Sequence, residues 1–161
     1  MKVVVSLLPD DLADKQAAIR DHLSRFLLRY TEGAGGIMLA FSDVKTIGKG
    51  GAIVNELPHI HYTVQLDALV FSPTKGAKLK GKVTESFQSH VSLVVCNYFN
   101  ASIAADKLKS MGFQYSADLE EWANEESGVA IYKDSSITFG VDRVHESGGI
   151  ISIEGSKPTI E

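Results

Sequence analysis

The sequence predicts an α+β protein in which a small domain, ordered strand-helix-strands, precedes a β-barrel of short strands. An apolar stripe at helical spacing occupies residues 12–30, and a long alternating run occupies 59–71. Beyond Ser72–Gly76, where proline and glycine interrupt the pattern, strand-like segments become short and frequent. We therefore expect one domain over residues 1–73 and a second over 74–161.

The first domain begins with a β-branched strand at Val3–Leu8, which Pro9 ends. Asp10 or Asp11 can then cap a helix running from Leu12 to Tyr30. One face of that helix is apolar, and the glycine-rich residues 31–36 end it. The apolar positions are Leu12, Ile19, Leu23, Phe26, Leu27 and Tyr30.

Strands complete this domain. We expect one at Gly36–Phe41, a glycine loop at 48–51, a short strand at Ile53–Glu56 and a long one at His59–Phe71. In the long strand, alternate residues from Ile60 to Val70 are apolar, so one face packs on the helix and the other is polar.

Five short strands are predicted in the second domain, as in a Greek-key barrel of the OB type. They are Lys78–Ser86, His90–Cys96, Gly128–Lys133, Ile137–His145 and Ile150–Gly155. The acidic segment 104–126 interrupts them, and we expect a short helical turn and an exposed loop there, anchored by Trp122.

Composition narrows the function. The net charge of −4 argues against a generic polyanion binder, so any nucleic-acid contact needs a local patch. The single cysteine, Cys96, excludes an internal disulfide and lies in an apolar run, which predicts a buried, inert thiol in a reducing compartment such as cytosol or nucleus. No apolar stretch reaches membrane-span length, and the apolar start ends too early at Pro9 for a signal peptide.

No catalytic, metal or cofactor site is predicted. The clusters at 33–36 and 48–51 lack the strand-loop-helix context of a phosphate loop. His59 and His61 would share one strand face, but no third or fourth ligand stands out, so we interpret them as polar strand residues.

A basic strand face is the most informative feature. Lys78, Lys80 and Lys82 alternate with apolar or small residues, so they share one face of a strand. Phe87 and His90 follow closely. Positive charge for the backbone and rings for base stacking are what single-stranded RNA binding requires. The alternative is an ordinary solvated strand with structural aromatics.

Several segments resemble a known family. Residues 81–95 resemble the opening of an S1-type OB fold, and Phe99-Asn100-Ala101-Ser102-Ile103 is similar to the stalk subunit of eukaryotic RNA polymerase I. That protein is related to its counterpart in archaeal RNA polymerase and to the stalk subunits of polymerases II and III. The resemblance extends over nearly the whole chain. Further matching segments are residues 36–44, 61–73, 137–144 and 150–156.

The resemblance implies a non-catalytic subunit in the nucleus and nucleolus, acting in ribosomal RNA transcription without a cofactor. Its first domain would be a tip domain that docks on the polymerase core, and a smaller stalk subunit would pack alongside both domains. Its S1-like barrel would meet the polymerase I initiation factor and nascent RNA. We expect core docking by Phe41, Ser42, Asp43, Val44, Lys45 and Thr46. We expect RNA contact by Lys78, Lys80, Lys82, Phe87 and His90.

The sequence leaves alternatives open. A stalk subunit of polymerase II or III would share the same architecture, and a free-standing S1/OB RNA-binding module would share the barrel. Long charged C-terminal extensions occur in the resembled family, and this chain stops soon after its last predicted strand. Functions located in such an extension are therefore not expected of these residues.

Overall fold

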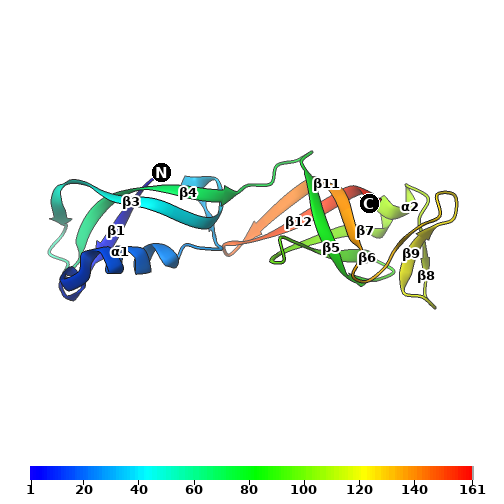
Figure 1. The fold of residues 1–161 in the computed structure, drawn as a ribbon, viewed down its shortest axis with the longest axis horizontal. Coiled ribbons are helices and arrows are strands. Elements are labelled where there is room, and N and C mark those ends of the chain that lie inside the picture. The colour runs from blue at the N-terminus through cyan, green and yellow to red at the C-terminus, as the bar shows by residue number, and fades with distance from the viewer. Residues whose placement is uncertain (161) are drawn as a thin grey trace. The chain divides into compact units, whose positions relative to one another are not determined.

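The computed structural model describes residues 1–160, and it is mostly β-structure. Its backbone forms two compact units, one spanning Met1–Ser72 and one beginning at Pro73 (Figure 1). Each unit has its own sheet and its own apolar core, so we describe them separately.

The first unit is a four-stranded sheet with a helix on one face. The strands lie in the order β1-β4-β3-β2, and each neighbouring pair is antiparallel. The elements are β1 (Lys2–Leu7), the 3-10 helix η1 (Pro9–Asp14), α1 (Lys15–Ser24), β2 (Tyr30–Thr31), the 3-10 helix η2 (Glu32–Ala34), β3 (Gly36–Ile53) and β4 (Ile60–Phe71).

The core of this unit lies between α1 and the sheet. Ile19 and Leu23 of α1 are almost completely buried, and Val64 and Leu66 of β4 oppose them, as the alternation in 59–71 predicted. Burying one such side chain contributes about 1.5–3 kcal/mol. This contact fixes which face of the sheet the helix covers and leaves the opposite face exposed.

The predicted helix over Leu12–Tyr30 was wrong at both ends. A 3-10 turn precedes α1, and the cap is Asp14, whose Oδ1 accepts a hydrogen bond from the Ala17 backbone N–H at 3.1 Å. At the other end Leu28 has φ of 61°, and its N–H donates to the Met38 carbonyl at 2.8 Å. Pairing with the sheet therefore replaces the last helical turns.

β3 is much longer than the predicted strand at Gly36–Phe41. It runs on to Ile53 through the glycine-rich residues 48–51, which form an irregularity between the pairs Ile47–Thr63 and Ala52–His61 rather than a separate loop. The strand predicted at Ile53–Glu56 is absent from this part of the chain. Asn55 and Glu56 instead have positive φ in the turn that leads to β4.

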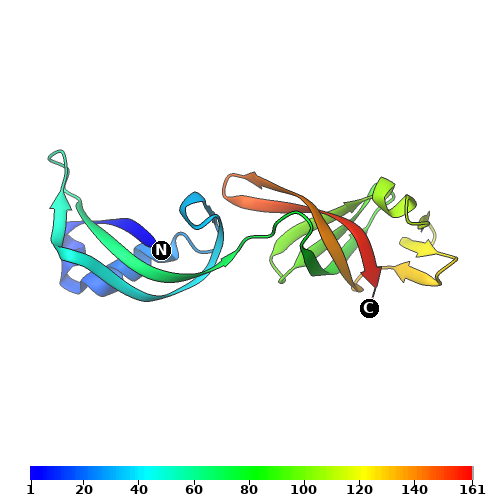
Figure 2. The same cartoon turned by 90° about the horizontal axis from the view of Figure 1, so that it is seen from above.

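The second unit contains the predicted five-stranded barrel, closed in the order β11-β12-β7-β6-β5 (Figure 2). Among its described strand pairs, only the β12–β7 pair is parallel. The barrel strands are β5 (Lys78–Ser86), β6 (His90–Val95), β7 (Phe99–Ala104), β11 (Ser136–Ser147) and β12 (Ile150–Ile160).

A small sheet interrupts the barrel between β7 and β11. It follows the short helix α2 (Ala105–Lys109) and consists of β8 (Gln114–Ser116), β9 (Glu121–Asn124) and β10 (Val129–Ile131). Trp122 is completely buried, so its predicted anchoring role is confirmed, although part of the predicted exposed loop belongs to this sheet.

Three details of the barrel prediction were wrong. The strand expected at Gly128–Lys133 is β10 of the small sheet, and the missing barrel strand is β7. The small and polar residues in β7 hide its alternation of buried Phe99 and Ile103 with exposed Asn100. Cys96 is exposed because β6 ends at Val95 and the chain turns there, with a φ of 52° at Cys96.

Among residues 1–160, none of the helices is long and apolar enough to span a membrane.

Candidate nucleic-acid and partner interfaces

The basic face of β5 has the predicted alternation. Lys78, Lys80 and Lys82 are exposed, while Gly81 and Val83 are buried beneath them. Gly81 lies close to the Phe139 ring, and a Cβ there would make a tight contact at 3.1 Å from a ring carbon. The barrel interior therefore fixes the direction in which the three lysines point.

Lys82, the last of these lysines along the strand, is paired with a carboxylate. Lys82 Nζ lies 2.8 Å from Oδ1 of Asp134, and both side chains are more than half exposed. The hydrogen bond from Lys82 and its positive charge lower the pKa of Asp134. An RNA phosphate would have to compete with this carboxylate for Lys82.

The aromatic pair lies where β5 turns into β6. The Phe87 and His90 rings have centroids 5.1 Å apart, and the Phe87 side chain is 43% exposed. The Phe87 backbone is held on both sides: its N–H donates to the His90 carbonyl at 2.9 Å, and its carbonyl accepts from Trp122 Nε1 at 2.9 Å. The small sheet thus supports the turn that presents the ring.

The five predicted RNA residues form two groups. Lys78 begins β5 and Phe87 follows its last residue, so the strand rise of ~3.3 Å per residue separates their backbones by roughly 30 Å. Around Phe87 a groove of about 370 Å³ also contains Tyr115 and Tyr132. Sequence reasoning missed these tyrosines, since only the fold of the small sheet brings them to the end of β5.

The predicted docking segment divides between two faces of β3. Phe41 and Val44 are half-buried and pack against the core under α1. Asp43 has φ of 49° at a β-bulge, where the pairing shifts between Ser42 and Lys45. Ser42, Asp43, Lys45 and Thr46 are exposed.

The two predicted strand histidines are not gathered with other ligands. His61 Nδ1 lies 2.8 Å from the Ser6 hydroxyl, a contact between β4 and β1. Within residues 1–160 there is no group of three or more histidine, cysteine, aspartate or glutamate side chains placed to hold a metal.

The barrel with its small sheet defines an OB-domain protein, and sequence comparison gives the family. A family model described as "RPA43 OB domain in RNA Pol I" matches residues 73–127, from the start of the second unit to just beyond β9. The chain is also similar to proteins named DNA-directed RNA polymerase I subunit RPA43. The resemblance predicted from the sequence, to the stalk subunit of RNA polymerase I, is therefore confirmed.

These relatives match both units. The Mus musculus protein is 32% identical over 156 residues, covering 96% of this chain and 44% of the relative. The Homo sapiens protein is 33% identical over 152 residues, which cover 94% of this chain and 41% of the relative. The Schizosaccharomyces pombe protein is 26% identical over 156 residues, which cover 94% of this chain and 90% of the relative. The chain thus spans less than half the length of the two mammalian relatives.

Proposed function

We propose that the chain is a non-catalytic, cofactor-free stalk subunit of RNA polymerase I that acts in ribosomal RNA transcription in the nucleus, within the nucleolus. The observation that carries this proposal is that similarity to subunits of this polymerase extends over both units and not over the barrel alone. A free-standing S1/OB module would account only for the barrel. The names of the relatives favour polymerase I over polymerases II and III.

Within this proposal the first domain, predicted as residues 1–73 and corresponding to the unit Met1–Ser72, is the tip domain that docks on the polymerase core. The exposed residues of the docking segment, Asp43 and Lys45 among them, supply the contact. The bulge at Asp43 supports this role, because bulges redirect side chains away from the regular pleat and are common at functional positions.

A smaller stalk subunit would pack alongside both domains, and the first unit offers it an open strand edge. β2 pairs only with Gly36 and Ile37, so the rest of the outer edge of β3 has no strand partner in the described chain. The sheet face opposite α1 also exposes Val4 and Leu69, at 59% and 63%. Long unpaired edges and exposed apolar side chains are features that a partner subunit normally covers.

The second domain, predicted as residues 74–161 and corresponding to the unit that begins at Pro73, would meet the initiation factor and nascent RNA. Lys78, Lys80 and Lys82 would bind phosphates, and the Phe87–His90 pair would stack on bases. Two exposed residues of the aromatic groove, Phe87 and Tyr132, add to the surface available for stacking.

Affinity purification of the tagged chain from its native cells tests the assignment. We expect the core subunits of RNA polymerase I and one smaller subunit to co-purify. A second tagged chain carrying Asp43→Lys and Lys45→Glu should lose the core subunits, whereas Lys49→Glu, a charge reversal further along β3, should retain them. Recovery of polymerase II or III subunits, or of no polymerase subunit, would overturn the proposal.

A further inference from the structure

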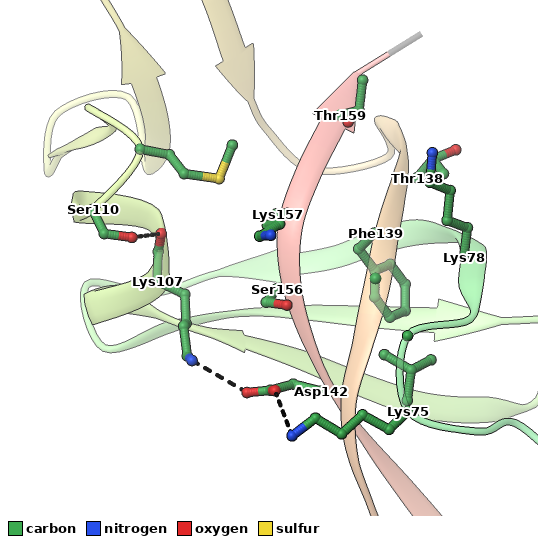
Figure 3. Close-up of a pocket in the computed structure, with 14 residues that line it drawn as sticks. Lys75, Lys78, Lys107, Ser110, Thr138, Phe139, Asp142, Ser156, Lys157 and Thr159 are labelled. Atoms are coloured by element: carbon green, nitrogen blue, oxygen red, sulfur yellow. Dashed lines mark hydrogen bonds and ion pairs between the residues drawn. The ribbon is translucent and has the colours of Figure 1, made fainter.

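A groove on the outside of the barrel carries a basic cluster that shares only Lys78 with the predicted RNA face. It has a volume of about 880 Å³ and lies over β11 and β12, between the start of β5 and α2 (Figure 3). Four lysines line it together with Asp142, which leaves an excess of three positive charges in a chain whose net charge is −4. The lysines are Lys75, Lys78, Lys107 and Lys157.

Two β-bulges aim side chains into this groove. The β11–β12 pairing shifts between Val141 and Arg143, which makes Asp142 the extra residue of β11. It shifts again opposite Lys157, which has a φ of 49°, a conformation that is uncommon for a residue other than glycine. Bulges are common at the rims of barrels and next to active sites, where they re-aim side chains.

The groove already holds a carboxylate between two lysines. Asp142 Oδ2 lies 3.2 Å from Lys107 Nζ, and its Oδ1 lies 4.0 Å from Lys75 Nζ (Figure 3). Lys78 and Lys157 line the same groove and make no ion pair with the residues that the structure describes. The charge on these two lysines is therefore available for an anionic ligand.

The floor of the groove is open at Gly140. A Cβ at this position would meet nothing closer than the Ser156 carbonyl oxygen at 3.6 Å, an ordinary contact, and its φ is not in the left-handed region. Neither packing nor backbone conformation requires glycine there. Glycine in a strand leaves the backbone bare, so that a ligand can approach it closely. Such an approach would explain why glycine occupies this position.

The remaining lining favours a peptide over RNA. Among residues 1–160 the only ring in the lining is Phe139, which is 1% exposed and fills the barrel interior, so bases have no surface for stacking. Met111 is 38% exposed at the groove, and a flexible thioether side chain suits varied apolar side chains. Hydroxyls of Ser156 and Thr159 add hydrogen-bonding groups.

We propose that this groove binds an acidic peptide segment of a partner protein, with carboxylates at Lys78 and Lys157 and an apolar side chain against Met111. The lysines supply charge complementarity, and the open floor at Gly140 admits the peptide backbone. This site is separate from the turn that carries Phe87, and its occupancy does not depend on assembly into a polymerase.

Fluorescence anisotropy with the 161-residue chain tests the site. The probe is a short fluorescein-labelled peptide of glutamates and aspartates with two central leucines, and its glutamine-asparagine counterpart is the control peptide. Lys157→Gln should weaken acidic-peptide binding about fivefold, whereas Lys109→Gln, an exposed lysine of α2 outside the groove lining, should leave it unchanged. Gly140→Thr should weaken it comparably by filling the floor without a change of charge.

Folding of each variant is checked by circular dichroism, and Lys157→Gln tests the site even if Gly140→Thr misfolds. Absence of acidic-peptide binding, or equal binding by Lys157→Gln and the unchanged chain, would overturn the proposal. A labelled oligouridylate is measured in parallel and should be insensitive to Gly140→Thr. If that substitution instead abolished oligouridylate binding and spared peptide binding, the groove would be an RNA site and the peptide assignment would be wrong.

Discussion

Lys82 and Asp134 form an ion pair at 2.8 Å across neighbouring segments of the barrel surface. Lys82 belongs to the basic face of β5, and Asp134 lies in the turn just before β11. The pair connects the predicted RNA site to a carboxylate that sequence reasoning did not consider. Asp134 therefore limits how strongly Lys82 can attract a phosphate.

Replacing Asp134 should strengthen RNA binding if the basic face of β5 is an RNA site. Asp134→Asn removes the competing carboxylate, so Lys82 can contact a phosphate and displace about one more counterion. We expect affinity for a labelled oligouridylate to rise about twofold to threefold at low salt. The slope of log affinity against log salt should steepen by about 0.7, the value for one phosphate contact on a single strand.

The matched control for this measurement is Asp118→Asn, which removes an exposed carboxylate from the loop between β8 and β9. It changes net charge by the same amount without touching Lys82. Equal effects of the two variants would show that only overall charge matters and that Lys82 makes no specific phosphate contact.

The same pair has a defined pH dependence. Because the pKa of Asp134 is lowered in the folded chain, its ion pair is complete above the unfolded pKa and is lost as pH falls through the lower, folded value. In Lys82→Met the pKa should move back toward the usual 3.8. NMR titration of the Asp134 carboxyl carbon measures this shift, and an unchanged midpoint would mean that the pair does not form in solution.

Some strands could be predicted from the sequence and others could not, and the difference has physical reasons. β4 and β5 were predicted well because strict alternation of apolar and polar residues fixes which face is buried. β7 was missed because Asn100, Ala101 and Ser102 have weak strand preferences, and only pairing with β6 and β12 makes the segment a strand.

Sites that depend on long-range geometry could not be predicted. The residues Asp142 and Lys157 are far from Lys75 in the sequence, and two bulges bring them into one groove. Cys96 was expected to be buried because its neighbours are apolar. The strand β6 ends one residue earlier, at Val95, so Cys96 lies in the turn and is exposed.

Trp122 should contribute both to the stability of the fold and to the position of Phe87 in the predicted stacking site. Its side chain is completely buried, and its indole N–H is donated to the Phe87 carbonyl at 2.9 Å. Trp122→Phe keeps most of the apolar volume but leaves that carbonyl without its partner, at a cost of about 1–3 kcal/mol. Trp122→Ala should cost about 3–5 kcal/mol.

Urea unfolding followed by circular dichroism measures both variants of Trp122. The Phe87 amide should also exchange with solvent faster in Trp122→Phe, because the turn loses its support from the small sheet. A Trp122→Phe chain as stable as the unchanged one, with unaltered exchange at Phe87, would mean that the indole hydrogen bond does not hold the turn.

Gly155 in β12 should tolerate no side chain, in contrast to Gly140 in β11. A Cβ on Gly155 would lie 2.5 Å from a carbon of the Phe139 ring and 3.1 Å from the Ile103 side chain, whereas the nearest atom to a Cβ on Gly140 is 3.6 Å away. Since Phe139 fills the barrel interior, it has little room to move, and overpacking costs about 1–3 kcal/mol. We expect Gly155→Ala to be destabilised by this amount and Gly140→Ala to be nearly neutral.

The fluorescence of Trp122, the only tryptophan, follows unfolding of the barrel unit in urea. Equal midpoints for the two variants would show that the barrel relaxes around the added methyl, so that the Phe139 ring is not held rigidly by its glycine neighbours.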